Sequence, residues 1–228
     1  MNALLMSKSK PKVLDWRYQN IVTPVKYQGQ CGSCYAFTAI AALESLLILK
    51  NKNLNQNIDL SEQQLLDCSS WYGNRGCRGG DVGQAYEYLK SFKIQRESSY
   101  PYTGIAGTCK YDESKGVTIV ENNEKYWVDG ADEIKLLVVQ NPVVAGLDAS
   151  SIYFKNYHSG IITSDDCGQQ MNHSVLIIGY GSEKNVEYWI VKNSYGTQWG
   201  ERGYARIKIG IKEGTCGINK YIAFPVLN

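Results

Sequence analysis

The periodicity of hydrophobic and polar positions changes about half-way along the chain. From Tyr35 to Leu49, apolar residues face nearly every side of a helix, a pattern that indicates a helix buried inside a protein. After about residue 120, short apolar runs predict strands over Val143–Leu147, Val175–Tyr180, Tyr188–Lys192 and Tyr204–Ile209. Helices followed by a sheet predict an α+β fold with two lobes and a cleft between them.

Two shorter helices are predicted in the first half from the residues at which they start. Ser61 and Gln64 have the spacing of a capping box, directly before a pair of leucines. A further helix is expected from Asp81, after a glycine pair, to about Phe92. The first half is therefore expected to be mainly helical.

The composition is typical of a folded globular protein. The 228 residues are 43% apolar, enough to bury a substantial core. The formal net charge is +2, too small to predict nucleic acid or an acidic membrane as a partner. The longest apolar stretch, Ala36 to Leu49, is interrupted by Glu44 and is shorter than the ~20 residues of a membrane helix. We therefore expect a soluble chain.

The N-terminal residues 1–12 are expected to form an extension to the folded unit. They contain a short apolar patch, Ala3 to Met6, but neither the longer apolar core nor the small-residue cleavage site of a secretion signal. We interpret them as the remnant of a precursor or a cloning scar.

The chain contains seven cysteines, a high number for its length. The odd count favours three disulfides and one free thiol in an oxidising compartment. The alternative is a set of reduced cysteines in the core of a cytosolic protein.

The segment Gln28–Phe37 is the densest candidate for chemistry. It is a polar, glycine-containing turn that leads directly into the predicted buried helix, and Cys34 falls in the first turn of that helix. Unpaired backbone N–H groups and the positive end of the helix dipole stabilise a thiolate at such a position. Cys34 is therefore predicted to have a lowered pKa and to be nucleophilic.

Cys31 and Cys34 also form a C-x-x-C pair, which has other interpretations. A thioredoxin-type redox site would follow a βαβ pattern, and none precedes this pair. A zinc site would need two more closely spaced Cys or His ligands, and none has that spacing, so no metal is predicted. A local disulfide or two buried thiols is the structural alternative.

A cysteine nucleophile needs a base, and the chain has only two histidines, His158 and His173. His173 precedes the apolar run Val175–Ile178, where a sheet would hold it rigidly, whereas His158 lies in a turn-like stretch. Asn193 follows the predicted strand Tyr188–Lys192, so its amide could accept a hydrogen bond from one imidazole nitrogen while the other faces the thiol. The alternatives are a structural histidine and a turn asparagine.

These residues and several further motifs resemble the papain and cathepsin family of cysteine proteases. Cys31–Tyr35 fits the family's nucleophile signature, for which histidine and asparagine are expected roughly 130 to 150 residues downstream. His173 lies within that interval and Asn193 slightly beyond it. The resemblance covers about residues 13–228, and its other motifs are Asp15–Arg17, Thr23–Lys26, Leu60–Gln63, Cys77–Gly80, Ser99–Tyr102 and Asn172–Ser174.

The resemblance implies a papain-like fold and a cysteine endopeptidase that works through an acyl-enzyme without metal or organic cofactor. Within a single unit of residues 13–228, a helical lobe would span about 19–124 and a β-barrel-like lobe about 125–223, with terminal segments crossing over. Cys34 and His173 would form a thiolate–imidazolium pair oriented by Asn193. The side-chain amide of Gln28 and the backbone N–H of Cys34 would donate to the oxyanion, a type of contact commonly worth a factor of about 10² to 10³ in rate.

The resemblance also implies the disulfides and the substrate contacts. Gly79 and Gly80 would lie along the substrate backbone, where a missing side chain permits close approach; the alternative is an ordinary turn. Tyr221 would form the floor of the pocket for the P2 side chain, which predicts a preference for compact residues such as Val or Pro. The implied disulfides, which leave Cys34 free, are Cys31–Cys77, Cys68–Cys109 and Cys167–Cys216. The other implied positions around this pocket are Asp81, Val82, Gly146 and Ser174.

Two tyrosines depart from the family pattern, which commonly has tryptophan at both positions. They are Tyr35, next to the nucleophile, and Tyr195, at the position that shields the histidine–asparagine hydrogen bond from water. Tyr195 would also contact substrate. Because tyrosine covers less area than tryptophan, we expect activity to be retained but weaker.

The expected partners follow from the same resemblance. They are peptide or protein substrates, cystatin-type inhibitors and the chain's own pro-segment, with a monomeric enzyme in a lysosome or vacuole or outside the cell. Another thiol acyl-transfer enzyme, such as an amidase or a transglutaminase-like protein, would not explain Gln28 or the glycine pair Gly79–Gly80. A non-catalytic papain-like binding or storage protein typically lacks the nucleophile or the base, and this chain has both.

Overall fold

The computed structural model describes residues 11–227 except 52, 129 and 164–166. Most of the predicted extension over residues 1–12 therefore lies outside the described residues. All three predicted helices are confirmed, each starting within one residue of its expected position. They are α1 (Cys34–Lys50), α2 (Glu62–Cys68) and α3 (Val82–Ser91), and two further helices, α4 (Ala131–Val138) and α5 (Ile152–Lys155), lie in the second half.

Side-chain caps explain where α2 and α3 begin. Ser61 Oγ accepts a hydrogen bond from the backbone N–H of Gln64 at 3.0 Å, and the side chain of Asp81 accepts one from Gln84 N–H at 3.2 Å. The capping box predicted at Ser61 is only half formed. The side-chain amide of Gln64 instead donates to Tyr88 Oη and to the carbonyl of Lys93, both at 3.0 Å.

The second half of the chain folds into a mainly antiparallel sheet. Four strands confirm the predicted runs: β5 (Val143–Leu147), β7 (His173–Glu183), β8 (Val186–Lys192) and β9 (Tyr204–Lys208). The order is β4-β10-β5-β7-β8-β9-β6, with β1 added beside β7, and only β6 and β9 pair in parallel. The other strands are β1 (Leu14–Asp15), β4 (Asn122–Trp127), β6 (Ile161–Ile162) and β10 (Tyr221–Val226), and a separate ribbon pairs β2 (Ile94–Gln95) with β3 (Gly116–Thr118).

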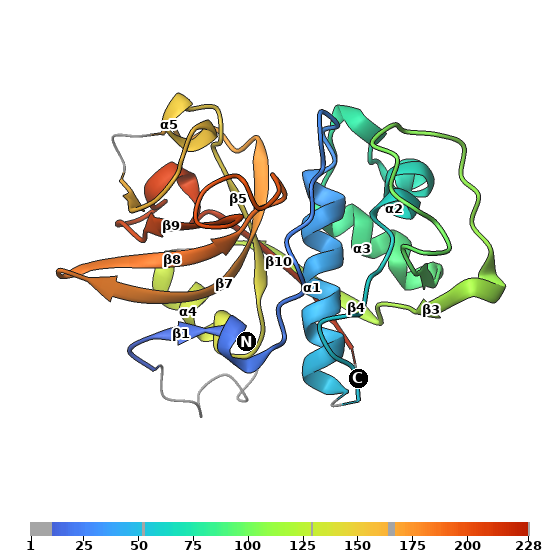
Figure 1. The fold of residues 1–228 in the computed structure, drawn as a ribbon, viewed down its shortest axis with the longest axis horizontal. Helices are drawn as coiled ribbons and strands as arrows, with labels where there is room; N and C mark the ends of the chain where they lie inside the picture. The colour runs from blue at the N-terminus through green and yellow to red at the C-terminus, as the bar shows by residue number, and fades with distance from the viewer. Residues whose placement is uncertain (1–10, 52, 129, 164–166, 228) are drawn as a thin grey trace.

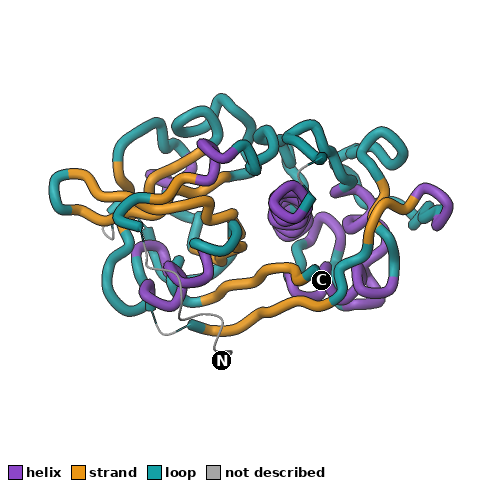
Figure 2. The backbone as a smooth tube through the Cα atoms, turned by 90° about the horizontal axis from the view of Figure 1, so that it is seen from below, coloured by secondary structure: helices purple, strands orange, loops and turns teal. Residues whose placement is uncertain are grey.

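Helix α1 stands between the sheet and helices α2 and α3 (Figures 1 and 2), while α4 and α5 lie on the sheet side. The apolar core around Ile40 and Leu43 of α1 contains residues from α2 and α3 and also Leu176 and Ile178 of β7. A second core, which includes Trp189, lies within the sheet half. One core that contains α1 and a second core within the sheet half produce the two-lobed shape seen in Figure 1.

Strands β4 and β10 extend from the sheet toward the helices (Figure 2). Asn123 of β4 donates to Glu87 of α3 at 2.8 Å, and Lys125 lies 3.5 Å from Asp81 at the start of α3. At the other end of the chain, β1 pairs with β7 in the sheet half. These contacts tie the two halves together.

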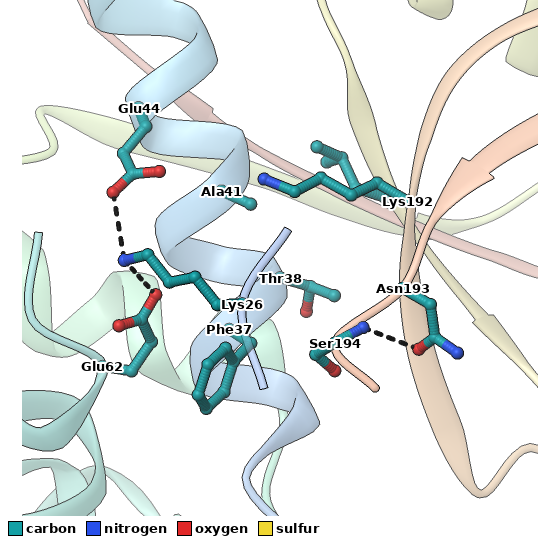
Figure 3. A pocket seen from close by; sticks show the side chains of 10 residues that line it. Lys26, Phe37, Thr38, Ala41, Glu44, Glu62, Lys192, Asn193 and Ser194 are labelled. Atoms are coloured by element: carbon teal, nitrogen blue, oxygen red, sulfur yellow. Dashed lines mark hydrogen bonds and ion pairs between the residues drawn. The ribbon is translucent and has the colours of Figure 1, made fainter. Parts of the chain in front are cut away.

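A buried charge cluster also joins the halves (Figure 3). We use this name for Lys26, Glu44, Glu62 and Lys192. Lys26 Nζ lies 2.7 Å from Glu62 Oε1 and 3.4 Å from Glu44 Oε1, and both carboxylates are almost fully buried. From the sheet side, Lys192 donates to Thr23 at 3.0 Å, and Thr23 donates to Glu44 at 2.6 Å. Burial lowers the pKa of Lys192 to about 8.

None of the helices in the described part of the chain is long and apolar enough to cross a bilayer.

We predict that Glu44→Ala lowers the free energy of unfolding by about 3 kcal/mol, because it leaves buried cationic and polar partners without their anion. The measurement is a denaturant melt followed by circular dichroism. The matched control is Glu213→Ala, which removes an exposed carboxylate 3.7 Å from Lys220 and should cost less than about 1 kcal/mol. Equal losses in the two variants would contradict a structural role for the cluster.

Candidate active site

Helix α1 begins at Cys34, so the thiol lies beside the first backbone N–H groups of the helix. These groups have no acceptor within the helix. The preceding residue, Ser33, does not cap the helix, because its hydroxyl lies 2.7 Å from Tyr102 Oη instead. The helix end is therefore left open to stabilise a negative charge at Cys34.

The sheet brings His173 and Asn193 together. His173 is the first residue of β7, and Asn193 directly follows β8, the antiparallel neighbour of β7. His173 Nε2 lies 2.8 Å from Asn193 Oδ1, and both side chains are buried. The same oxygen accepts from the backbone N–H of Ser194 at 2.8 Å, which fixes the orientation of the amide. His173 Nε2 is therefore the donor, and Nδ1 is left to exchange a proton with another group.

The Cys34 thiol is half-buried and contacts His173 and Ser174. Burial raises its pKa, while the hydrogen bond and charge of His173 and hydrogen bonds from the side chain and backbone of Ser174 lower it, and the balance lowers the pKa to about 7. Above about pH 7 the thiolate is the major form. A thiolate beside a histidine held by an asparagine is the arrangement of an activated nucleophile.

Aromatic rings cover the histidine on the side away from the cleft. The Tyr195 ring lies 4.9 Å from the His173 ring at an interplanar angle of 35°, and Phe154 contacts both rings edge-on. Trp199 packs against Tyr195 and Phe154. His173 is 7% exposed and Asn193 is 3% exposed, so their hydrogen bond is shielded from water. Tyr195 gives this shielding although it is smaller than a tryptophan.

A groove of about 450 Å³ passes over Cys34 and His173. Its volume is typical of a site for a small ligand or a peptide segment. The residues predicted around the P2 pocket all line it, and so does the glycine pair. These residues are Gly79, Gly80, Asp81, Val82, Gly146, Ser174 and Tyr221.

The two glycines have different physical reasons for lacking a side chain. Gly79 has a φ of +100°, and the place where its Cβ would lie is open space. A Cβ on Gly80 would lie 2.3 Å from Oδ1 of the buried Asn74, which accepts from the backbone N–H of Asp81. Within the described chain, neither backbone N–H nor C=O of Gly80 has a hydrogen-bond partner. The Gly80 backbone is therefore free to pair with a bound peptide.

Tyr221 lines the groove and is held in place. Its hydroxyl donates to Asp81 Oδ2 at 3.0 Å, and its ring packs edge-on against Trp127. Met171, which the sequence did not point to, also lines the groove and packs against Gly146, where an added Cβ would clash with the Met171 sulfur. Together, Tyr221 and Met171 narrow the pocket.

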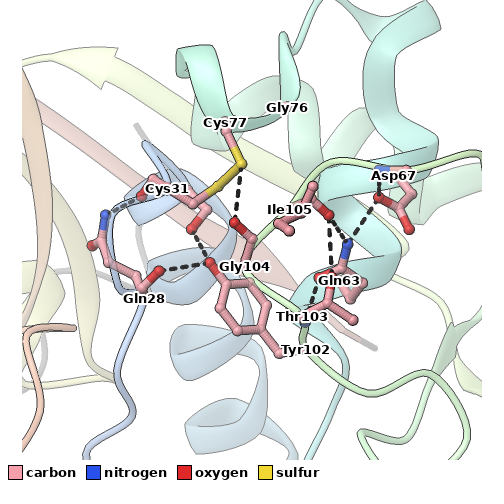
Figure 4. The surroundings of a disulfide bond; sticks show 12 residues. Gln28, Cys31, Gln63, Asp67, Gly76, Cys77, Tyr102, Thr103, Gly104 and Ile105 are labelled. Atoms are coloured by element: carbon pink, nitrogen blue, oxygen red, sulfur yellow. Dashed lines mark hydrogen bonds between the residues drawn. A yellow bond between two sulfur atoms is a disulfide. The ribbon is translucent and has the colours of Figure 1, made fainter.

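Gln28 is buried beside the loop that leads to Cys34 (Figure 4). Its Nε2 donates to the carbonyl of Cys31 at 2.7 Å, and its Oε1 accepts from Ser194 Oγ at 2.6 Å. An amide nitrogen carries two hydrogens, so one remains for another acceptor. Gln28 does not line the groove itself, nor does Tyr195, which lines a neighbouring hollow.

The three disulfides join the pairs that the resemblance implied: Cys31–Cys77, Cys68–Cys109 and Cys167–Cys216. Cys34 is the free cysteine. The C-x-x-C pair is therefore neither a redox disulfide nor a zinc site, since Cys31 is bonded to Cys77. In the part of the chain that the structure describes, no three histidine, cysteine or carboxylate side chains gather to hold a metal ion.

Other residues of the site came only from the structure. Arg75 and Arg78 line the groove with Met171. The signal that could have indicated the two arginines is their position next to Cys77, within and beside the motif Cys77–Gly80. The hydrogen bonds of Ser174 to the thiol could not be read from the sequence. The second histidine, His158, is exposed and lies in the hollow that contains Tyr195 rather than in the groove.

Comparison with known proteins agrees with this geometry. The model of the papain family cysteine proteases matches residues 10–226. The chain is 42% identical to a cathepsin L-like proteinase of Fasciola hepatica, over 97% of this chain and 67% of that protein. It is 40% identical to cysteine proteinase 1 of Entamoeba histolytica, over 94% of this chain and 68% of that protein. The chain therefore belongs to the papain family of cysteine proteases and is a cysteine endopeptidase by class.

Solved structures show the same fold. Digestive procathepsin L 3 from the larval midgut of Tenebrio molitor has a TM-score of 0.89 and 38% identity, covering 100% of this chain and 73% of its own. The ragweed pollen allergen Amb a 11, a cysteine protease solved in its proform, has a TM-score of 0.90 and 38% identity, with 69% of its own chain covered. The chain thus spans about two thirds of the length of these relatives and neighbours.

We predict that Ser174→Ala raises the pKa of Cys34 by about half to one unit, because the thiolate loses a hydrogen bond of about 1 kcal/mol. The thiolate would then form at higher pH, so the rate of alkylation by iodoacetamide should rise at higher pH than in the native enzyme. Ser45→Ala serves as control. Ser45 lies in α1, the helix that begins at Cys34, and its buried hydroxyl donates to the carbonyl of Ala41 rather than to the thiol. A profile for Ser174→Ala that coincides with the native one would contradict the contact.

Proposed function

We propose that this endopeptidase uses Cys34 as nucleophile, His173 as acid and base, and Asn193 as the residue that orients the imidazole. The observation that carries the proposal is the meeting of the α1 N-terminus with the His173–Asn193 pair at the groove. The helix end and the imidazole both favour the thiolate, and the buried asparagine leaves Nδ1 of His173 facing the sulfur.

The reaction proceeds in two halves. The Cys34 thiol passes its proton to Nδ1 of His173, and the resulting thiolate attacks the peptide carbonyl carbon. The oxyanion of the tetrahedral intermediate accepts from the backbone N–H of Cys34 and from the second amide hydrogen of Gln28. His173 then protonates the leaving amine as the C–N bond breaks, which leaves an acyl-enzyme thioester. In the second half His173 takes a proton from water, the hydroxide attacks the thioester, and the thiolate leaves.

The substrate lies extended along Gly79 and Gly80. The unpaired backbone groups of Gly80 support pairing with the peptide main chain, and the open space at Gly79 supports close approach. Asp81 contributes mainly by holding Tyr221. Val82 and Ser174 complete the wall of the pocket.

The P2 pocket takes compact apolar side chains such as Val or Pro. Three features support this preference: the Tyr221 ring that lines the groove, its fixed hydroxyl, and the Met171 side chain packed on Gly146. A bulky P2 ring would have to displace one of these side chains.

The setting and partners are proposed from family and chemistry. Three disulfides are typical of proteins that fold in an oxidising compartment, so we place the enzyme in a lysosome, a vacuole or outside the cell. The inhibitory partners would be cystatin-type proteins and a pro-segment, both of which would occupy the groove, and the enzyme would act as a monomer.

Labelling with an epoxide inhibitor specific for papain-like thiols tests the mechanism. The native enzyme should be labelled at one site, Cys34→Ala should not be labelled, and His173→Ala should lose about 10² to 10⁴-fold in peptide hydrolysis because the proton carrier is gone. His158→Ala, which removes the histidine outside the groove, should react as the native enzyme does. Equal labelling of all four proteins, measured by mass spectrometry, would overturn the assignment.

A peptide library tests the pocket. We expect the native enzyme to cleave peptides with Val at P2 faster than those with Phe, and Tyr221→Ala to reverse the order, with a change in the ratio of kcat/KM values of about tenfold. Tyr18→Ala is the control, because Tyr18 is 87% exposed and does not line the groove. A native preference for Phe at P2 would contradict the proposed pocket.

A further inference from the structure

Two arginines at the edge of the groove have no assigned role. Arg75 and Arg78 line the same groove as Cys34 and Gly80, and both side chains are exposed to solvent. Neither forms a salt bridge or a side-chain hydrogen bond in the described part of the chain. They therefore present two free guanidinium groups to whatever occupies the groove.

The local fold puts both arginines on one side. Gly76–Arg78 is a short 3₁₀ helix, η4, with Arg75 as its first flanking residue. The side chains of Arg75 and Arg78 line the same groove. The backbone is closed by hydrogen bonds from Arg75 N–H to the carbonyl of Gly79 at 2.9 Å and from Arg78 N–H to that of Arg75 at 3.1 Å.

This turn is fixed to the loop that carries the nucleophile (Figure 4). Cys77, between the two arginines, is bonded to Cys31, and Gly32 N–H donates to the carbonyl of Cys77 at 3.0 Å. The backbone that carries the two guanidinium groups is therefore tied to the loop that leads to Cys34. A substrate group that they bind is thereby positioned relative to the thiol.

The charges around the groove leave these arginines uncompensated. Among the residues that the structure describes, Asp81 is the one carboxylate that lines it. That carboxylate already accepts from Tyr221 at 3.0 Å and lies 3.5 Å from Lys125. The edge formed by Arg75 and Arg78 is thus positive, and guanidinium groups recognise carboxylates with paired hydrogen bonds.

We propose that Arg75 and Arg78 bind an acidic side chain of the substrate, on the peptide segment that lies against Gly79 and Gly80, and so make the enzyme selective for acidic peptides. The inference rests on the proposed function, because it assumes that the peptide follows the glycine pair. It concerns the substrate residues that lie beyond the P2 pocket, at P3 and P4.

The test is a set of peptides with a constant Val at P2 and either Glu or Gln at P3 or P4. For the native enzyme at low salt, we expect kcat/KM to be about fivefold higher for Glu than for Gln at one of these positions. The double variant Arg75→Gln/Arg78→Gln should bring this ratio to about one, and high salt should reduce it in the native enzyme because the arginines are exposed. The ratio does not depend on how much of each preparation is folded.

Arg96→Gln is the matched control, since Arg96 is also exposed but lies outside the groove, and it should keep the native ratio. Equal rates for Glu and Gln peptides at both positions in the native enzyme would overturn the inference, as would a ratio that persists in the double variant. Cleavage of the Gln peptides by the native enzyme, but not by Cys34→Ala, would leave the proposed function standing in either case.

Binding to Cys34→Ala separates the two proposals completely. Fluorescence anisotropy with labelled Glu and Gln peptides measures their affinities without any cleavage. Tighter binding of the Glu peptide that disappears in the Cys34→Ala form of the double variant supports the arginine site even if no peptide is hydrolysed. Equal affinities for the two peptides would reject it even in an active protease.

Discussion

Burial of helix α1 on all sides is the constraint on which the rest of the structure depends. Thirteen of its seventeen residues are buried, among them Glu44, whose carboxylate takes part in the buried charge cluster. A helix with no solvent-exposed face must contact other elements on every side. Here α2 and α3 pack on one side of α1, and β7 and β10 pack on the other. Its N-terminus can then reach the surface only at the junction of the two lobes. Cys34 lies at that end, which is why the thiol is both at the groove and beside unpaired N–H groups.

The hydrogen-bonded pairing of two strands positions the side chains that lie beside the thiol. His173 begins β7 and Asn193 follows β8, and the pairing of these two strands sets the distance between the imidazole and the amide. Ser174, next along β7, lies 3.0 Å from Thr38, one turn along α1 from Cys34. One contact between helix and sheet is thus made by residues next to the thiol, so a movement between the lobes at this point would also displace His173 and Ser174 from Cys34.

Around this centre, small side chains and fixed large ones decide what can enter. Gly79 and Gly80 leave backbone accessible, while Tyr221 and Met171 fill the neighbouring pocket. The Cys31–Cys77 disulfide joins the nucleophile loop to the turn that carries Arg75 and Arg78. The proposed apolar selectivity close to the thiol and the proposed selectivity for acidic residues farther along the groove would therefore come from different segments of the chain.

The sequence by itself determined the elements and the chemistry whose signals are local. An all-round apolar run predicted α1, apolar runs predicted β5, β7, β8 and β9, and the motif around Cys34 indicated the nucleophile, because propensity and periodicity act over a few residues. The polar strand β4 was not predicted, since its residues become a strand only by pairing with β10. Only the tertiary structure decided that Met171 packs on Gly146, that Ser174 contacts the thiol and that Arg75 and Arg78 have no acidic partner among the described residues. Each of these depends on which side chains from distant segments meet, and this is set by packing that no local pattern records.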